Sequence, residues 1–315
     1  MKCLVTGAAG FIGSHLCERL LRDGHRVRGL DAFIPYYPRA VKERNIAGLL
    51  ANRHFEFAAF DLRTTELDDV VGDVQAIFHL AAMPGLPRSW TEFDLYQSCN
   101  FTATHRLVQS ALRNRGLQKF VLASTSSVYG RHASGGESLP LAPVSPYGVT
   151  KLAAENLCRA FASECGLPLV VLRYFSVYGP RQRPDMGYHQ FVNAILRDEP
   201  ITVFGDGQQV RGNTFISDCV EATMLAAQGL PGETFNVGGG ETASVWDIIG
   251  RLENITGRSA RVQQKPARAG DQRHTFADTS RLTRHLGWKP TVGLDEGLAR
   301  QVAWQSQSAG LSRAA

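Results

Sequence analysis

The sequence predicts an α/β fold in which a doubly wound parallel sheet is followed by a smaller C-terminal α/β domain. Over residues 1–175, short apolar runs typical of buried parallel strands alternate with helical patterns. The elements become shorter and rich in arginine in residues 183–211 and 239–308, whereas residues 213–237 have the pattern of a helix and a strand that return to the main sheet. We therefore expect a first domain over residues 1–175, with about 213–237 returning to it, and a second domain over residues 176–315.

A glycine-rich turn near the N-terminus predicts a dinucleotide site. The apolar run 3–6 is followed by residues 7–13, GAAGFIG, and then by a helical pattern that ends at Gly24. In this strand, turn and helix order, glycines permit the tight turn, the approach of a pyrophosphate and close helix packing, while the helix N-terminus offers free N–H groups. We expect a Rossmann-type sheet with these cofactor contacts: Gly7, Gly10, Phe11, Ile12 and Gly13.

An acidic residue favours NAD over NADP. The strand 26–30 ends in Asp31, eighteen residues past Gly13. A carboxylate there accepts hydrogen bonds from both ribose hydroxyls of NAD and repels the additional phosphate of NADP. The alternative is a set of turn glycines and a surface acid in an ordinary α/β protein, but the flanking strand and helix favour the NAD site.

Later strand ends supply further candidate cofactor contacts. Runs 54–57 and 75–80 have strand character, and a helix is expected over residues 94–115. Small residues after a strand let the cofactor lie close, whereas Asp61 has the alternative interpretation of a helix cap and His79 that of a packed core histidine. The candidates from these segments and from the end of the strand 168–174 are Asp61, Leu62, Leu80, Ala81, Ala82, Asn100 and Tyr174.

Hydroxyl groups and a Tyr-Lys pair predict acid–base chemistry. The strand 119–123 leads into four hydroxyl residues, 124–127, which are costly to bury without polar partners. Tyr147 and Lys151 lie one helical turn apart, so they share a face. A nearby ammonium stabilises a phenolate, which makes Tyr147 a candidate proton acceptor.

Charge and cysteine content exclude other classes. The net charge is +5, but lysines and arginines are dispersed without an aromatic-basic run, so we expect a small anionic substrate and no nucleic acid. Six scattered cysteines form no disulfide or metal motif, and no metal site is expected. Residues 1–4 enter the first strand directly and no apolar run reaches ~18 residues, so we expect a cytoplasmic protein without membrane attachment.

Together these motifs resemble the extended short-chain dehydrogenase/reductase family, and within it the nucleotide-sugar 4-epimerases. The resemblance covers the chain from Gly7 to about Pro290. It implies that Tyr147 is the catalytic base, that Lys151 is its electrostatic partner and a ribose anchor, and that Thr125 holds the reacting sugar oxygen. It also implies a homodimer formed by the helices that begin near Asp94 and Tyr147.

The substrate half carries the resemblance further. Residues at the positions of the family's diphosphate, ribose and uracil contacts are Phe204, Arg211, Arg268 and Asp271. Family members that dehydrate or decarboxylate sugars carry an acid just after the catalytic threonine, where this chain has serines. Other details resemble UDP-glucuronate 4-epimerases and imply further substrate contacts: Pro84, Gly85, Ser126, Ser127, Ser176 and Arg183. The serines are expected around the uronate carboxylate and Arg183 near the nucleotide. Two departures are Ala32, where an Asn is common, and Pro87, where an Arg is frequent.

The expected activity is NAD-dependent epimerisation at carbon 4 of UDP-glucuronic acid to UDP-galacturonic acid through a 4-keto intermediate. The alternatives are a UDP-glucose 4-epimerase and a UDP-glucuronate decarboxylase. A third alternative is an NAD-binding sensor or scaffold without catalysis. Such a protein needs the glycine motif but not Thr125, Tyr147 and Lys151.

Overall fold

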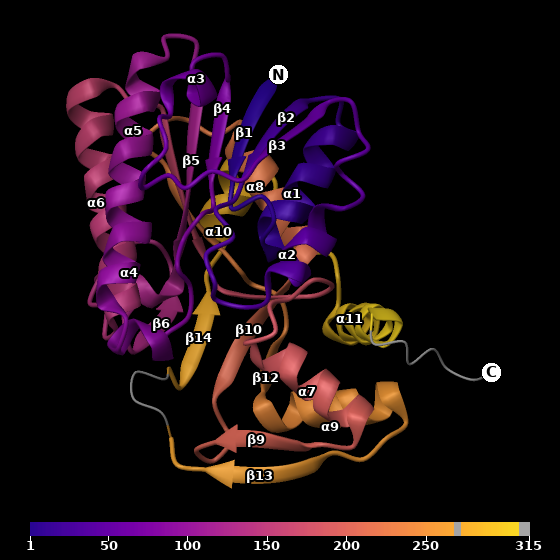
Figure 1. The fold of residues 1–315 in the computed structure, drawn as a ribbon. Helices are drawn as coiled ribbons and strands as arrows, with labels where there is room; N and C mark the ends of the chain where they lie inside the picture. The colour runs from indigo at the N-terminus through magenta and orange to yellow at the C-terminus, as the bar shows by residue number, and fades with distance from the viewer. Residues whose placement is uncertain (268–271, 309–315) are drawn as a thin grey trace.

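A computed structural model describes residues 1–267 and 272–308, and it divides them into a larger and a smaller lobe (Figure 1). The larger lobe is built on a seven-stranded sheet in the order β11-β7-β5-β4-β1-β2-β3, with all neighbours parallel. Its strands are β1 (Lys2–Thr6), β2 (Arg26–Leu30), β3 (Phe55–Ala58), β4 (Ala76–His79), β5 (Lys119–Thr125), β7 (Leu169–Tyr174) and β11 (Thr234–Val237). The predicted α/β fold with a large parallel sheet is confirmed.

Helices cover both faces of this sheet (Figure 1). Successive strand residues point to opposite faces, so Cys3 and Val5 pack into one core and Leu4 into another. The first core includes α1 (Phe11–Arg22), α8 (Ile216–Ala226) and α10 (Ser280–Leu286), with α2 (Arg39–Ile46) beside them. The second includes α3 (Asp68–Val71), α5 (Ala103–Arg113) and α6 (Pro146–Cys165).

The segment expected as one helix over residues 94–115 contains a π-helical turn. A short 3₁₀ turn, η1 (Pro87–Trp90), precedes α4 (Phe93–Gln97), and the π-helical turn η2 (Ser98–Thr102) joins α4 to α5. Turns of this kind are often found at functional sites.

Within the described residues, the smaller lobe contains two sheets and three helices. One sheet is formed by β6 (His132–Gly135), β8 (Ser176–Tyr178), β10 (Val210–Phe215), β12 (Thr242–Ser244) and β14 (His274–Ala277). The other pairs β9 (Pro200–Phe204) with β13 (Arg261–Lys265). The helices are α7 (Gly187–Arg197), α9 (Val245–Thr256) and α11 (Leu294–Ser308).

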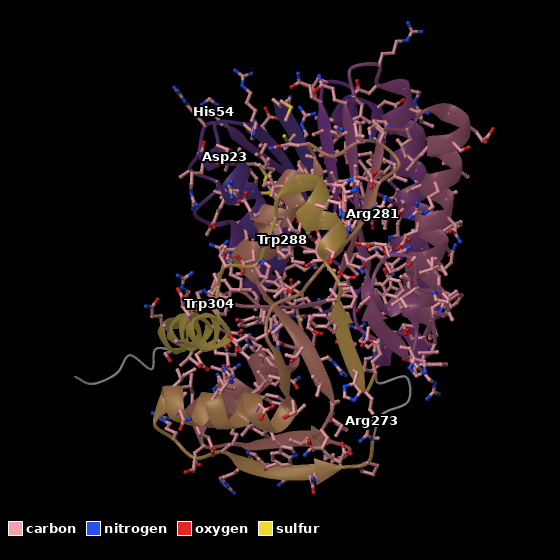
Figure 2. All side chains as sticks on the ribbon, turned by 180° about the vertical axis from the view of Figure 1, so that it is seen from behind. Asp23, His54, Arg273, Arg281, Trp288 and Trp304 are labelled. Carbon is pink, nitrogen blue, oxygen red and sulfur yellow. The ribbon has the colours of Figure 1, made fainter. Side chains whose placement is uncertain are left out.

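Two tryptophans hold C-terminal segments in place (Figure 2). Trp304 of α11 packs against the His189 ring of α7, with ring centroids 6.3 Å apart. The indole of Trp288 donates a hydrogen bond to the Asp218 carbonyl of α8 at 3.0 Å. Among the helices of the described residues, none has both the length and the apolar character needed to cross a bilayer.

Candidate active site

A cavity of about 300 Å³ lies where β1, β2, β3, β4, β5 and β7 end. Ligands of open parallel sheets bind at this carboxyl edge, because the loops there diverge and leave a crevice. The predicted site residues that line it are Gly7, Gly10, Phe11, Ile12, Gly13, Asp31, Asp61, Leu62, Leu80, Ala81, Ala82, Pro84, Thr125, Tyr147, Lys151, Tyr174, Ser176 and Arg183.

The glycine turn forms one wall of the cavity and has the shape that a pyrophosphate needs. Gly7 has a φ of 71°, and a Cβ there would lie 2.9 Å from the Ala81 nitrogen. A Cβ on Gly13 would overlap the Gly7 carbonyl oxygen. The N-cap of α1 is Gly10, which has no side chain to occupy the N–H groups of the first turn. The turn therefore fits a dinucleotide phosphate at the helix N-terminus.

Asp31 forms a buried ion pair that the sequence motifs do not indicate. Its Oδ1 accepts hydrogen bonds from the Phe33 N–H at 2.8 Å and from the Lys42 ammonium at 3.1 Å. Lys42 also lies 5.4 Å from the centre of the Tyr37 ring, and both residues line the cavity. Lys42 belongs to α2, so only the packing of that helix brings it to Asp31.

Asp61 lies in the loop that follows β3 and pairs with Arg63, which also lines the cavity. Its carboxylate accepts hydrogen bonds from the Arg63 side chain at 3.0 and 2.7 Å and from the Arg63 backbone N–H at 2.9 Å. This hydrogen bonding by Arg63 lowers the pKa of Asp61. The acid is therefore a fixed, charged group at this end of the cavity.

Tyr147 and Lys151 line the opposite end together with Thr125. Serine and proline start their helix, because Ser145 is the N-cap of α6, accepts a hydrogen bond from the Gly148 N–H and precedes Pro146. Burial lowers the pKa of Lys151 to about 8. Burial raises the pKa of Tyr147, and the Thr125 hydroxyl and the Arg183 guanidinium oppose that rise.

Arg183 reaches this end of the cavity from the loop before α7. Its guanidinium pairs with the Asp185 carboxylate at 3.0 and 2.9 Å and lies 5.8 Å from the centre of the Tyr36 ring. Arg88 lies 4.7 Å from the centre of the same ring. A side chain at Gly85 would strike the Tyr36 hydroxyl, so Gly85 lies directly against that hydroxyl. Arg183 and Tyr36 thus bring a cation and an aromatic ring into the part of the cavity that contains Tyr147.

Asn100 does not line the cavity, although the sequence analysis expects it near the nicotinamide. Its side-chain oxygen accepts a hydrogen bond from the Met83 N–H at 2.7 Å. Its amide donates to the Met83 carbonyl and to the Thr150 hydroxyl, both at 3.1 Å. Asn100 therefore fixes Met83, which does line the cavity, to the helix that carries Tyr147.

A chain of buried hydrogen bonds connects Asn100 to the floor of the cavity through His79. Thr104 donates to the Asn100 carbonyl at 2.7 Å, so His79 Nε2 donates to Thr104 at 2.8 Å. His79 Nδ1 then accepts from the Thr6 hydroxyl at 2.8 Å, and Thr6 accepts from the Ala81 N–H at 3.1 Å. Burial lowers the pKa of His79 to about 3, which keeps the ring neutral. His79 is a core residue that joins β1, β4 and α5.

The remaining predicted substrate residues lie outside the cavity lining or outside the described part of the chain. Ser126 and Ser127 form the 3₁₀ turn η3 (Ser126–Tyr129), where the Ser127 N–H donates to the Thr125 hydroxyl at 3.1 Å. Phe204 and Arg211 lie on β9 and β10 of the smaller lobe. Arg268 and Asp271 lie outside the described residues.

Comparison with known proteins places the chain in a family. The family model described as "NAD dependent epimerase/dehydratase family" matches residues 3–238. An uncharacterized UDP-glucose epimerase of Bacillus subtilis, YtcB, is 46% identical over 97% of this chain and 98% of its own length. A UDP-glucuronate 4-epimerase of Thermodesulfobacterium geofontis is 36% identical over 97% of this chain and 96% of its own length.

A solved structure is similar over nearly the whole chain. It is the UDP-glucuronic acid 4-epimerase of Bacillus cereus in complex with UDP-glucuronic acid and NAD. The TM-score is 0.95 at 43% identity, and the match covers 98% of this chain and 100% of that protein. The resemblance identified in the sequence is confirmed: the chain belongs to the NAD dependent epimerase/dehydratase family.

Proposed function

We propose that this protein catalyses the NAD-dependent epimerisation of UDP-glucuronic acid to UDP-galacturonic acid at carbon 4, through a 4-keto intermediate. The observation that carries the proposal is one cavity that brings Tyr147, Lys151 and Thr125 to one end and the glycine turn and Asp31 to the other. The Bacillus cereus structure, which contains UDP-glucuronic acid and NAD, supports the choice of sugar and cofactor.

In this proposal the reactive end of the cavity moves one proton. Tyr147 removes the proton from the 4-hydroxyl and returns it to the 4-keto oxygen after the sugar has turned over. NAD, when bound, supplies a reversible acceptor for the hydride of carbon 4. The Lys151 ammonium stabilises the phenolate, and Thr125 donates a hydrogen bond that orients the sugar oxygen. The buried positions of Lys151 and Thr125 keep this geometry fixed.

Arg183 and Ser176 are positioned for the uronate carboxylate. Both line the cavity together with Tyr147, and the Arg183 guanidinium acts on the Tyr147 hydroxyl, so we assign Arg183 to the carboxylate rather than to the nucleotide. A ketone at carbon 4 is beta to that carboxylate and invites loss of carbon dioxide. A guanidinium and hydroxyls that hold the carboxylate in the plane of the ketone prevent the orbital overlap that decarboxylation requires.

In this proposal one lobe binds the cofactor and the other binds the nucleotide of the substrate. Residues 1–175 and about 213–237 bind NAD, and residues 176–315 bind the UDP group. Phe204 and Arg211, on the consecutive strands β9 and β10 of the smaller lobe, are the candidate uracil and diphosphate contacts. Arg268 and Asp271, which lie outside the described residues, complete that set in the family resemblance.

We also propose a homodimer that packs α4 and α6 of two copies together. Trp90, Phe93 and Val149 on this side of the larger lobe are 55%, 46% and 47% exposed. Large apolar side chains near each other on a surface are typical of interfaces between proteins.

The test is a product analysis. The protein incubated with UDP-glucuronic acid should form UDP-galacturonic acid until the two reach equilibrium. A UDP-pentose product would show decarboxylation instead. Turnover of UDP-glucose alone would instead favour a UDP-glucose epimerase, the activity for which the Bacillus subtilis relative is named.

Tyr147→Phe tests the catalytic assignment. The variant should retain bound NAD and lose at least ~100-fold in turnover, because the phenol supplies the acid–base group. Glu164→Gln, an exposed position on the same helix, is the matched control for chemistry and should keep full turnover. Activity within tenfold of the wild type in Tyr147→Phe would remove this residue from the mechanism.

A further inference from the structure

Glu155 is a fully buried carboxylate that the mechanism above does not use. It lies on α6 one helical turn beyond Lys151, and its side chain has no exposed surface. The Ser124 hydroxyl donates to its Oε1. Arg173 of β7 donates to Oε1 from Nε at 3.1 Å and to Oε2 from Nη2 at 2.8 Å. A two-pronged guanidinium contact of this kind is a strong pairing for a carboxylate, because both of its oxygens accept charge-assisted hydrogen bonds.

The Arg173 guanidinium is itself fixed by a second set of buried groups. Its Nη1 donates to the Tyr129 hydroxyl at 2.9 Å. That hydroxyl donates to the Asn236 side-chain oxygen of β11 at 2.7 Å, and the Asn236 amide donates to the Gly135 carbonyl of β6 at 3.1 Å. The network therefore anchors Glu155 to three strands besides the one that carries Ser124.

Among the described residues, Glu155 is the acidic side chain that acts on the Lys151 ammonium. His79 of β4 is neutral, since burial lowers its pKa to about 3. Cys158 of α6 is neutral, since burial raises its pKa to about 12. Burial lowers the pKa of Lys151 itself, and Glu155 opposes that effect. Tyr147 lies one helical turn before Lys151 on α6 and is the group that Lys151 assists in the proposed mechanism.

We propose that Glu155 is a positioning residue for the epimerisation: held by Arg173 and Ser124, it keeps Lys151 an ammonium beside Tyr147. The inference rests on the proposed role of Tyr147 and Lys151. Phenolate, ammonium, carboxylate and guanidinium then alternate in sign from Tyr147 to Arg173. Arg159, a partly exposed residue of α6, is a second cation on the same carboxylate, 3.7 Å from Glu155 Oε2. Ser124 also lines the cavity, so the same carboxylate fixes part of its wall.

The charge of Lys151 can be followed without substrate. The chain has only six lysines, so a ¹³C-lysine-labelled NAD-bound protein gives few signals, and Lys151→Met identifies the relevant one. In Glu155→Gln the titration midpoint of Lys151 should move to lower pH by about one to two units, for charges ~6 Å apart at an effective dielectric constant of ~20. Glu164→Gln, an exposed position on the same helix, should leave the midpoint unchanged.

The alkaline limb of the pH profile of kcat should move by a similar amount in Glu155→Gln. Should Glu155→Gln not fold, the double variant with Arg173→Met removes both buried charges. Its Lys151 midpoint should still lie below that of the wild type, because the lost carboxylate is one helical turn from Lys151 on α6, whereas the lost guanidinium comes from β7. A wild-type midpoint in the folded single or double variant would overturn the inference and leave Glu155 a structural role. A shifted midpoint in a protein that does not convert UDP-glucuronic acid would refute the proposed substrate but not the role of Glu155.

Discussion

Acidification should destabilise the protein through His79. This side chain is 1% exposed, and burial lowers its pKa to about 3, against about 6.5 for an unfolded chain. The unfolded state therefore binds the proton more tightly. The stability that neutral His79 contributes is complete above pH 6.5 and is lost progressively as the pH falls toward 3. At pH 5, which is ~1.5 pH units below the pKa of the unfolded chain, the stability lost through His79 is about 2 kcal/mol.

The perturbation that isolates this effect is His79→Gln, which removes the titrating group. The variant should be less stable at pH 7 by about 1–3 kcal/mol, because Thr6 and Thr104 lose well-placed partners. Its further loss between pH 7 and pH 5, measured by urea unfolding, should be about 2 kcal/mol smaller than that of the wild type. His54→Gln at an exposed site of the larger lobe (Figure 2) is the control and should keep the wild-type slope. An unchanged slope in His79→Gln would refute the reasoning.

Two other substitutions test the two ends of the cavity. Lys42→Met should lower the free energy of unfolding by about 3 kcal/mol and weaken NAD binding at least ~10-fold, because it leaves the buried Asp31 carboxylate without its cation. Calorimetry would measure both effects, with the exposed Lys265→Met as control. A wild-type affinity for NAD would count against the role given to Lys42. Arg183→Met should lower kcat/KM for UDP-glucuronic acid by ~100-fold or more through the loss of a charge pair, and should affect UDP-glucose far less. Arg88→Met, which also removes a guanidinium over Tyr36, should preserve the ratio between the two sugars. Equal losses on both sugars in Arg183→Met would contradict its contact with the carboxylate.

The parallel sheet was predictable because its signals are local. Each buried strand is a short apolar run, and the helix between β1 and β2 follows from Leu16 and Leu20 at helical spacing. The turn at Gly7 is also a local signal, because Gly10 and Gly13 both pack against the Gly7 carbonyl a few residues earlier in the chain. For these elements, the local sequence pattern and the tertiary structure require the same residue types at the same positions.

The charged partners of the site were not predictable in the same way. Lys42 and Arg173 come from elements whose patterns indicate only a helix and a strand, and each finds its carboxylate through packing. The orientation of Asn100 depends on the π-helical turn η2, and the helical periodicity of the surrounding sequence gives no sign of that turn. Side chains in cores are placed by the sum of many contacts, which no short motif encodes.

The position of β11 affects how the chain can fold during synthesis. This strand pairs with β7 at the edge of the large sheet, yet it lies about sixty residues later in the sequence, after the first strands of the smaller lobe. While the ribosome makes the intervening segment, β7 remains an open edge that can pair with another nascent chain. We therefore expect premature termination before residue 234 to yield insoluble fragments rather than a working cofactor-binding half.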